Sequence, residues 1–218
     1  MTGVDFRHCD TYVPLVMECS VEHACKGRPR EFDLDEALAA ALRVFWAKGY
    51  EAASMADLTE AMGITKPSLY AAYGNKEALF TKALDLYERE KLAYIGEALQ
   101  APTSRGVAER LLRGALQMQT SDCEPRGCMR VISSVSCPEA ESIRADLMAR
   151  RQSSQRAICE RMERAKTEGD LPPETDTDGL CAYLGAILQG MSVQAAGGAS
   201  KAQLQALVET SLSMWPGK

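Results

Sequence analysis

The residues best suited to bind another molecule gather in the segment 65–76, where a lysine, hydroxyl groups and a tyrosine recur at helical spacing. The side chains expected on the outer face of such a helix are Lys66, Ser68, Tyr70 and Ala72. A lysine donates hydrogen bonds to guanine O6 and N7, a serine donates or accepts, and a small methyl group contacts thymine. A tyrosine hydroxyl suits a phosphate oxygen. These residue types together predict a surface that reads the edges of DNA bases.

Two short helices joined by a tight turn would position this surface. Ser54 is a suitable N-cap for the first helix, and Asp57 completes an S-x-x-D capping box. Gly63 supplies the left-handed backbone with which helices commonly end. Thr65 caps the second helix, and Pro67 stands in its first turn, where no backbone N–H is lost. The pattern predicts a helix-turn-helix whose second helix enters the major groove.

Cationic residues flank this motif on both sides. Lys26, Arg28 and Arg30 place three positive charges in five residues, and this segment suits a minor groove or phosphate groups. An unstructured, solubilising tail is the alternative for these residues. On the other side, Asn75 caps a further helix whose free N–H groups, with Lys76 beside them, suit a backbone phosphate.

Residues 31–80 resemble the DNA-binding domain of the TetR/AcrR (tetracycline-repressor-like) family of transcriptional regulators. The matching segments are A-L-x-V-F-x-x-K-G-Y (41–50), S-M-A-D-L (54–58), A-M-G-I-T-K-P-S-L-Y (61–70) and N-K-E-A-L-F (75–80), together with Tyr73. The resemblance implies a homodimeric repressor that a small effector releases from a palindromic operator, and no enzyme activity. The predicted DNA-binding residues are Arg28, Arg30, Ser54, Thr65, Lys66, Pro67, Ser68, Tyr70, Ala72, Tyr73 and Lys76.

Other function classes find less support in the sequence. It has no G-x-S-x-G, Walker loop, H-E-x-x-H or dinucleotide glycine fingerprint, and both histidines fall within the first 25 residues. An enzyme is therefore not predicted. A helical protein-interaction module that binds no DNA stays open as an alternative, although it would not need the basic segment, Lys66 and Tyr70 together.

Composition bounds the fold class. The 218 residues are 46% hydrophobic and only 6% aromatic, with abundant Ala, Leu, Met and Glu, which favours helices. The net charge of −5 argues against a non-specific coat on nucleic acid, but not against a site-specific reader with a local basic patch. No apolar run approaches the roughly 18 residues of a membrane span. Eight irregularly spaced cysteines fit a reducing cytoplasm better than a disulfide framework.

We therefore expect an all-α protein in which a three-helix helix-turn-helix domain precedes a helical domain for effector binding and dimerisation. The expected domains are an N-terminal extension without ordered structure (1–25), the basic arm and helix-turn-helix (26–78), and the helical remainder (79–218). The expected helices are 33–48, 54–62, 65–73, 75–99, 104–119, 127–135, 138–168, 176–196 and 200–215. By similarity, the last two would pair with their twins in a four-helix dimer interface. Their apolar residues are Leu180, Leu184, Ile187, Leu188, Met191, Leu204, Leu207, Val208 and Leu212, for which a plain intramolecular core is the alternative.

The extension carries side chains of metal-ligand types. These are His8, Cys9, Cys19, His23 and Cys25. They include no C-x-x-C pair or zinc-finger spacing, so neither a metal nor another cofactor is predicted. Met17 is an alternative start of the chain.

Two features of the second half could serve effector binding or sensing. One is a soft lining composed of Met118, Met148, Met162, Tyr183 and Trp215, with Gln189 as a polar group. Methionines fill cores as readily as they line adaptable pockets. The other is Cys128, which would sit at a helix N-terminus beside Arg126 and Arg130, a setting for an oxidant or electrophile sensor with Cys123 or Cys137 as resolving partner. A small buried hydrophobe is the alternative for Cys128.

Overall fold

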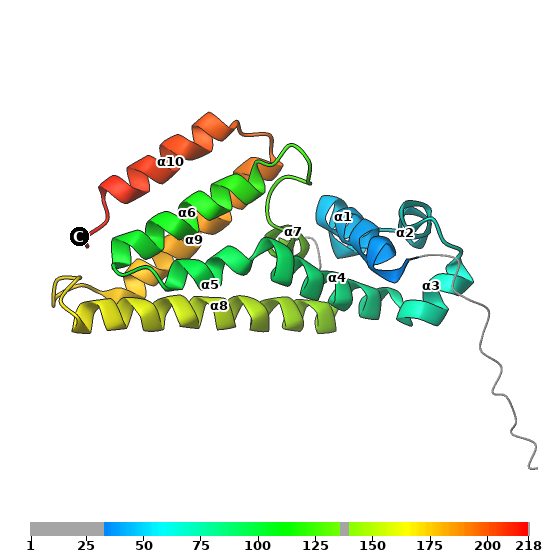
Figure 1. Ribbon diagram of the computed structural model, residues 1–218, viewed down its shortest axis with the longest axis horizontal. Coiled ribbons are helices and arrows are strands. Elements are labelled where there is room, and N and C mark those ends of the chain that lie inside the picture. The colour runs from blue at the N-terminus through cyan, green and yellow to red at the C-terminus, as the bar shows by residue number, and fades with distance from the viewer. Residues whose placement is uncertain (1–32, 136–139, 218) are drawn as a thin grey trace, which may run out of the picture. The chain divides into compact units, whose positions relative to one another are not determined.

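The computed structural model describes residues 33–135 and 140–217, which form ten helices and no strand (Figure 1). The predicted all-α class is confirmed over these ranges. The extension 1–25 with Met17, the basic residues Arg28 and Arg30, and Cys137 lie outside the described residues. Within the described ranges, no helix has the length and apolar character needed to cross a membrane.

The helices follow the expected order along the chain. They are α1 (Leu34–Ala52), α2 (Met55–Met62), α3 (Lys66–Tyr73), α4 (Lys76–Lys91), α5 (Ala93–Leu99), α6 (Ser104–Gln119), α7 (Met129–Val135), α8 (Glu141–Thr167), α9 (Thr177–Ala196) and α10 (Lys201–Ser213). Gly49, the predicted end of the first helix, does leave the helical conformation with φ of 75°, but a last turn continues to Ala52.

The single helix predicted for 75–99 is wrong. The chain leaves the helical path at Leu92 (φ −108°, ψ 5°), which separates α4 from α5. Neither glycine nor proline marks this point, so local propensity does not reveal it. Beyond the break, the ring of Tyr94 lies against the backbone of Gly114, where a side chain on α6 would collide with it.

The first hydrophobic core joins the helix-turn-helix to α4 and α7. Phe45, Trp46, Phe80 and Tyr87 expose none of their surface. The rings of Phe45 and Phe80 meet edge to face with centroids 5.0 Å apart, and those of Trp46 and Tyr87 do so at 4.9 Å. Such contacts add to the burial of large apolar area. They fix α1 against α4, and α4 in turn starts where α3 ends.

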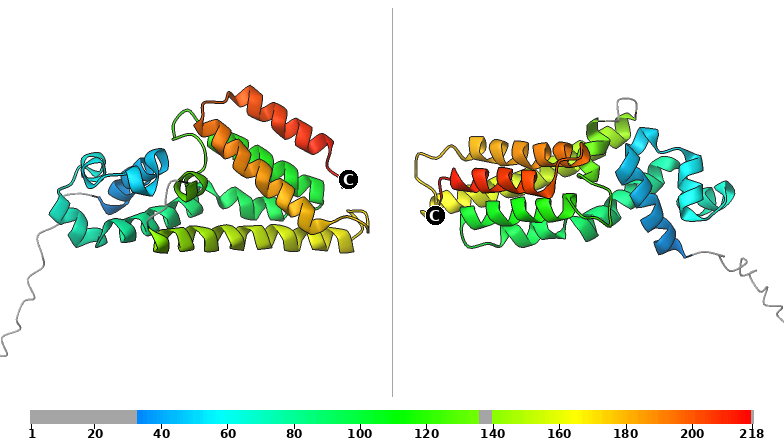
Figure 2. Two further views of the ribbon diagram at one scale, coloured as in Figure 1. Left: turned by 180° about the vertical axis from the view of Figure 1, so that it is seen from behind. Right: turned by 90° about the horizontal axis from the view of Figure 1, so that it is seen from above.

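The second hydrophobic core lies among α5, α6, α8, α9 and α10 (Figure 2). Of the apolar residues predicted for the dimer interface, Leu184, Met191, Leu204, Val208 and Leu212 are buried within this chain. Leu180, Ile187, Leu188 and Leu207 are only partly buried. The intramolecular alternative therefore holds for the first set, while the second set keeps apolar surface available.

Candidate nucleic-acid interface and ligand pocket

The first helix of the helix-turn-helix is fixed by short polar contacts at its start. The Ser54 N–H donates to Asp57 Oδ2 (2.9 Å), and the Asp57 N–H donates to Ser54 Oγ (3.1 Å), completing the predicted capping box. Lys48 Nζ lies 2.7 Å from Asp57 Oδ1. Lys48, followed by the backbone and side chain of Ser54, lowers the pKa of the Asp57 carboxyl from 3.8 to about 2. Asp57 is therefore ionised at any ordinary pH, as a cap at the positive end of a helix should be.

The turn and the next cap match the sequence pattern. Gly63 has φ of 64° and ends α2, and the Ile64 N–H donates to the Thr59 carbonyl at 3.1 Å. Thr65 Oγ1 accepts from the Ser68 N–H (3.4 Å) and lies 2.9 Å from Ser68 Oγ. Because both hydroxyl groups already face each other, they stand at the start of α3 in a defined geometry.

The inner face of α3 anchors the helix. Leu69 is fully buried and Tyr73 is 6% exposed. The Tyr73 hydroxyl donates to the Leu34 carbonyl at 2.7 Å, which links the end of α3 to the start of α1. This geometry favours a supporting role for Tyr73; a direct DNA contact by this residue stays a prediction.

The outer face of α3 presents several of the predicted contact residues, but Ala72 is not among them. Lys66 and Pro67 are exposed, as is Tyr70, and Lys66 Nζ lies 6.0 Å from the centroid of the Tyr70 ring. Ala72 is half-buried against the core, whereas Ala71 is exposed. Residues 67, 70 and 71 share one stripe at spacings of three and four, a signal in the sequence that could have identified Ala71.

Lys76 stands at the start of α4, beside the end of α3. Its Nζ donates to the Glu51 carbonyl (3.3 Å) and lies 4.5 Å from the centroid of the Tyr50 ring. A phosphate contact by Lys76 would replace or share these partners.

A cavity of about 120 Å³ lies among α5, α6, α7, α8 and α9. Of the residues predicted for effector binding, Met118, Cys128, Met148 and Gln189 line it. Met162 is fully buried in the second core, and Tyr183 is half-buried on α9; neither lines the cavity. Sequence reasoning missed Gln119, Arg130 and Gln155 as lining residues, since nothing local distinguishes a cavity wall from a core.

Cys128 is buried and immediately precedes α7. Its Sγ accepts from the Tyr87 hydroxyl at 3.4 Å, and its N–H donates to Ser192 Oγ at 2.7 Å. Burial, followed by the neighbouring Cys128 thiol, raises the pKa of Tyr87 well above its usual 10, so this hydroxyl stays protonated and able to donate. The two flanking arginines form hydrogen bonds with groups other than the Cys128 thiol. Arg126 donates to the Ala199 carbonyl, and Arg130 NH1 donates to Glu88 Oε1 at 3.1 Å.

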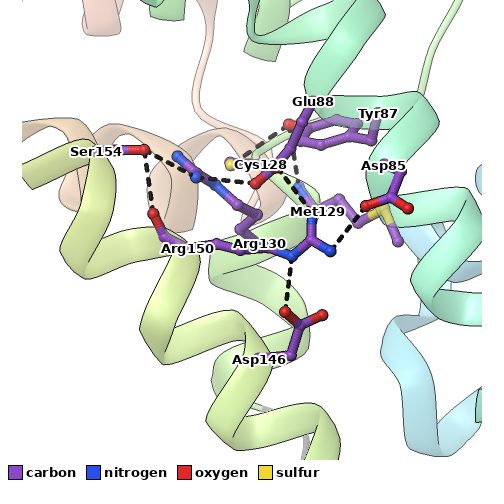
Figure 3. Close-up of polar contacts among 9 residues, drawn as sticks. All are labelled: Asp85, Tyr87, Glu88, Cys128, Met129, Arg130, Asp146, Arg150 and Ser154. Carbon is purple, nitrogen blue, oxygen red and sulfur yellow. Dashed lines mark hydrogen bonds and ion pairs between the residues drawn. The ribbon is translucent and has the colours of Figure 1, made fainter.

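A network of ion pairs connects the cavity wall to α4, as Figure 3 shows. Glu88 of α4 accepts from Arg130 on one oxygen and from Arg150 on the other, at 3.1 and 2.8 Å. Arg150 also pairs with Asp85 (2.7 Å) and Asp146 (2.9 Å). Burial alone would lower the pKa of Arg150, but these carboxylates outweigh it and raise that pKa above its usual value.

A second set of contacts joins α1 and α4 to the loop before α7. Trp46 Nε1 donates to the Gly127 carbonyl at 3.0 Å. Glu124 of the same loop pairs with Arg43 of α1 (3.4 Å) and Lys91 of α4 (2.8 Å). Of the helices that hold α3, α4 thus contacts lining residues of the cavity directly, and α1 contacts the loop that leads to them. The described part of the chain contains no cluster of side chains suited to hold a metal ion.

Comparison with known proteins agrees with this architecture. The profile described as "Bacterial regulatory proteins, tetR family" matches residues 37–83. The HTH-type transcriptional repressor ComR of Escherichia coli (strain K12) is 35% identical over 195 residues, covering 88% of this chain and 92% of ComR. The repressor BdcR of the same organism is 37% identical over 106 residues, covering 47% of this chain and 53% of BdcR.

A solved structure is similar over nearly the same span. It is a cysteine mutant of the TetR family transcriptional regulator CifR complexed with 26-bp double-strand operator DNA. The identity is 45%, the TM-score is 0.82, and the match covers 87% of this chain and all of the CifR chain. These relatives are transcriptional regulators, and two of them match almost from end to end. The chain therefore belongs to the TetR family of bacterial regulatory proteins and is a DNA-binding transcriptional regulator.

Proposed function

We propose that the chain is a homodimeric repressor that binds a palindromic operator through the outer face of α3 and leaves it when a small molecule enters the cavity. The observation that carries the proposal is the contrast between the two faces of α3. Its inner side chain Leu69 is fully buried, while Lys66 and Tyr70 are exposed on the other side. A helix held in this way can enter a major groove without rearranging its support. Because bacterial DNA lies in the cytoplasm, the proposal places the protein there and gives it no catalytic step.

The proposed dimer forms through α9 and α10. Leu180, Tyr183 and Ile187 share one side of α9 at helical spacing and are only partly buried, as is Leu207 of α10. Pairing with the same residues of a second copy would remove this apolar surface from water, which is the main favourable contribution to association. A dimer of this kind sets two α3 helices about one helical turn of DNA apart.

The proposed release acts through α4. This helix starts directly after α3, and its Tyr87 hydroxyl reaches Cys128 Sγ (3.4 Å) and Met118 Sδ (3.5 Å), both in the cavity wall. A ligand that displaces either sulfur would move Tyr87, and with it the angle of α3. Coupling is typically about 1–3 kcal/mol and is reciprocal, so operator DNA would weaken the effector by the same factor.

The test is selection of bound duplexes from a random DNA pool at a fixed physiological salt concentration. The variant is Lys66→Ala/Tyr70→Ala. The matched control is Lys201→Ala/Met214→Ala, which removes the exposed lysine at the start of α10 and the exposed methionine just after its end. We expect the wild type and the control to enrich one palindrome, and the α3 variant to lose it. Equal enrichment by both variants would refute the assignment of α3 as the reading helix.

A sensor thiol is a second candidate for the same cavity. Cys128 lines the cavity and is a free cysteine, so an oxidant or electrophile small enough to enter could reach its sulfur. We expect peroxide to release the wild-type protein from DNA and to leave the Cys128→Ser variant bound. Equal release of both proteins would exclude the sensor role.

A further inference from the structure

One polar group in the cavity wall has no partner. Gln119, the last residue of α6, is only 3% exposed, and its Oε1 makes no hydrogen bond to any residue that the structure describes. A buried amide oxygen left without a donor is costly, and buried polar groups therefore nearly always find one. The side chain lines the cavity, so a molecule inside the cavity can reach it.

Several other polar side chains of the wall already have hydrogen-bond partners. Gln189 Nε2 donates to the Gly185 carbonyl at 3.0 Å, and Gln155 Nε2 donates to the Cys181 carbonyl at 2.9 Å. Ser154 accepts from Arg130 at 3.1 Å and donates to the Arg150 carbonyl at 3.2 Å. Gln119 therefore stands out as a buried group that is still able to select a ligand.

The size of the cavity limits what that ligand can be. A cavity of roughly 150 Å³ in another protein holds one benzene molecule, and the cavity here measures about 120 Å³. Most of the surface of its wall is apolar, with Leu92, Ile95, Leu111, Leu147 and Ile158 among the lining residues. Such a wall suits an apolar body and leaves few positions for polar groups.

We propose that the effector is a compact, mostly apolar molecule of benzene's size or less, carrying one O–H or N–H group that donates to Gln119 Oε1. This inference rests on the proposed function, since it identifies the chemical class that would release the repressor.

The position of Gln119 also connects such a ligand to the helix-turn-helix. The Gln119 carbonyl accepts from the Gly127 N–H at 3.2 Å, and the Gly127 carbonyl accepts from Trp46 Nε1 at 3.0 Å. Two successive hydrogen bonds thus lead from the recognising residue to α1. A ligand that draws the Gln119 side chain toward itself would strain the first of these bonds.

The experiment compares pyrrole with furan, two rings of nearly equal size of which only pyrrole has an N–H. Their dissociation constants are measured by calorimetry on the full chain without DNA. We expect the wild type to bind pyrrole at least about tenfold more tightly than furan, because one buried hydrogen bond separates the two. In Gln119→Met the ratio should fall to about one. The matched control is Gln117→Met on the same helix, which removes an exposed amide that does not line the cavity and should keep the wild-type ratio.

Equal affinity of the wild type for both rings, or an unchanged ratio in Gln119→Met, would overturn the inference. A measurement on the wild type alone covers the case in which Gln119→Met fails to fold. In the ¹⁵N-labelled wild type, pyrrole but not furan should shift the side-chain amide resonances of Gln119. Operator selection is a separate readout: its failure counts against the proposed function, and equal ring affinities with intact operator binding count against this inference only.

Discussion

The helix-turn-helix and the cavity are built in opposite ways. The first is defined by neighbours in sequence: Ser54 with Asp57, Gly63 at the turn, and Thr65 with Ser68. The cavity wall is assembled from α5, α6, α7, α8 and α9. A surface fixed by local contacts can keep its shape while the distant wall changes.

The largest expected effect comes from removing the buried anchor of α3. Leu69→Ala should lower the free energy of unfolding by about 2–5 kcal/mol, because it opens a cavity beneath the reading helix. The comparison is Met148→Ala at the cavity wall, a side chain that is 51% exposed, where a change of less than about 0.5 kcal/mol is expected. Urea denaturation measures both. Similar losses in the two variants would contradict the burial contrast.

The next effect tests the loop that joins the two regions. Gly127 has φ of 86°, and an added Cβ would lie 2.9 Å from the Ser192 carbonyl oxygen. Gly198 has a similar φ of 92° with nothing within 4 Å of such an atom. The left-handed backbone costs about 1–2 kcal/mol in either alanine variant, and the collision should add about 1 kcal/mol or more in Gly127→Ala. The difference in stability loss between the two variants, measured by thermal unfolding, is the cost of the collision. Equal losses would mean that the loop moves away from the added Cβ at no cost.

A smaller effect separates the two regions functionally. Ser54 caps α2 and Ser200 caps α10, each within a capping box. Ser54→Ala and Ser200→Ala should each cost about 1 kcal/mol of stability. Only Ser54→Ala should also weaken binding to the selected operator, since its cap supports the reading helix. An equal loss of DNA affinity in Ser200→Ala would show that the regions are not independent.

The smallest effect is a pH dependence confined to the helix-turn-helix. The pKa of Asp57 is lowered from 3.8 to about 2 by Lys48 and Ser54. Its contribution to stability is therefore fully present above pH 3.8 and is lost as the pH falls toward 2. The difference in Tm between wild type and Asp57→Asn should shrink across that window. Introducing Lys48→Met into both proteins should move the loss toward higher pH, and an unchanged window would exclude Lys48 as the cause.

The sequence could predict what short-range chemistry determines. The capping pairs, the turn at Gly63 and the inward side of Leu69 all follow from residue type and helical spacing. Gly49 leaves the helical conformation where the sequence predicts the end of the first helix, but the helix continues for one further turn to Ala52. Contacts between residues within one or two helical turns of each other depend on the local sequence, so the sequence alone predicts them.

Tertiary packing set the features that the sequence did not reveal. The break at Leu92 has no local marker, and Tyr94 finds its place only against Gly114 of another helix. Met118 and Met162 have the same side chain, yet one lines the cavity and the other is sealed in the core. Gln119 was overlooked because an amide at the end of a helix is usually solvated. Its burial depends on the loop around Gly127.

The burial of Trp46 has an optical consequence. The chain has two tryptophans. Trp46 of α1 packs against Tyr87 and donates to the Gly127 carbonyl, while Trp215, which follows α10, donates to Ser104 at the start of α6. Indole emission shifts to longer wavelengths when the ring becomes more exposed to water and to shorter wavelengths when it becomes less exposed. In a Trp215→Phe variant, all tryptophan fluorescence would come from Trp46. Binding of an effector would then be detected as a shift in the emission wavelength, without any added dye.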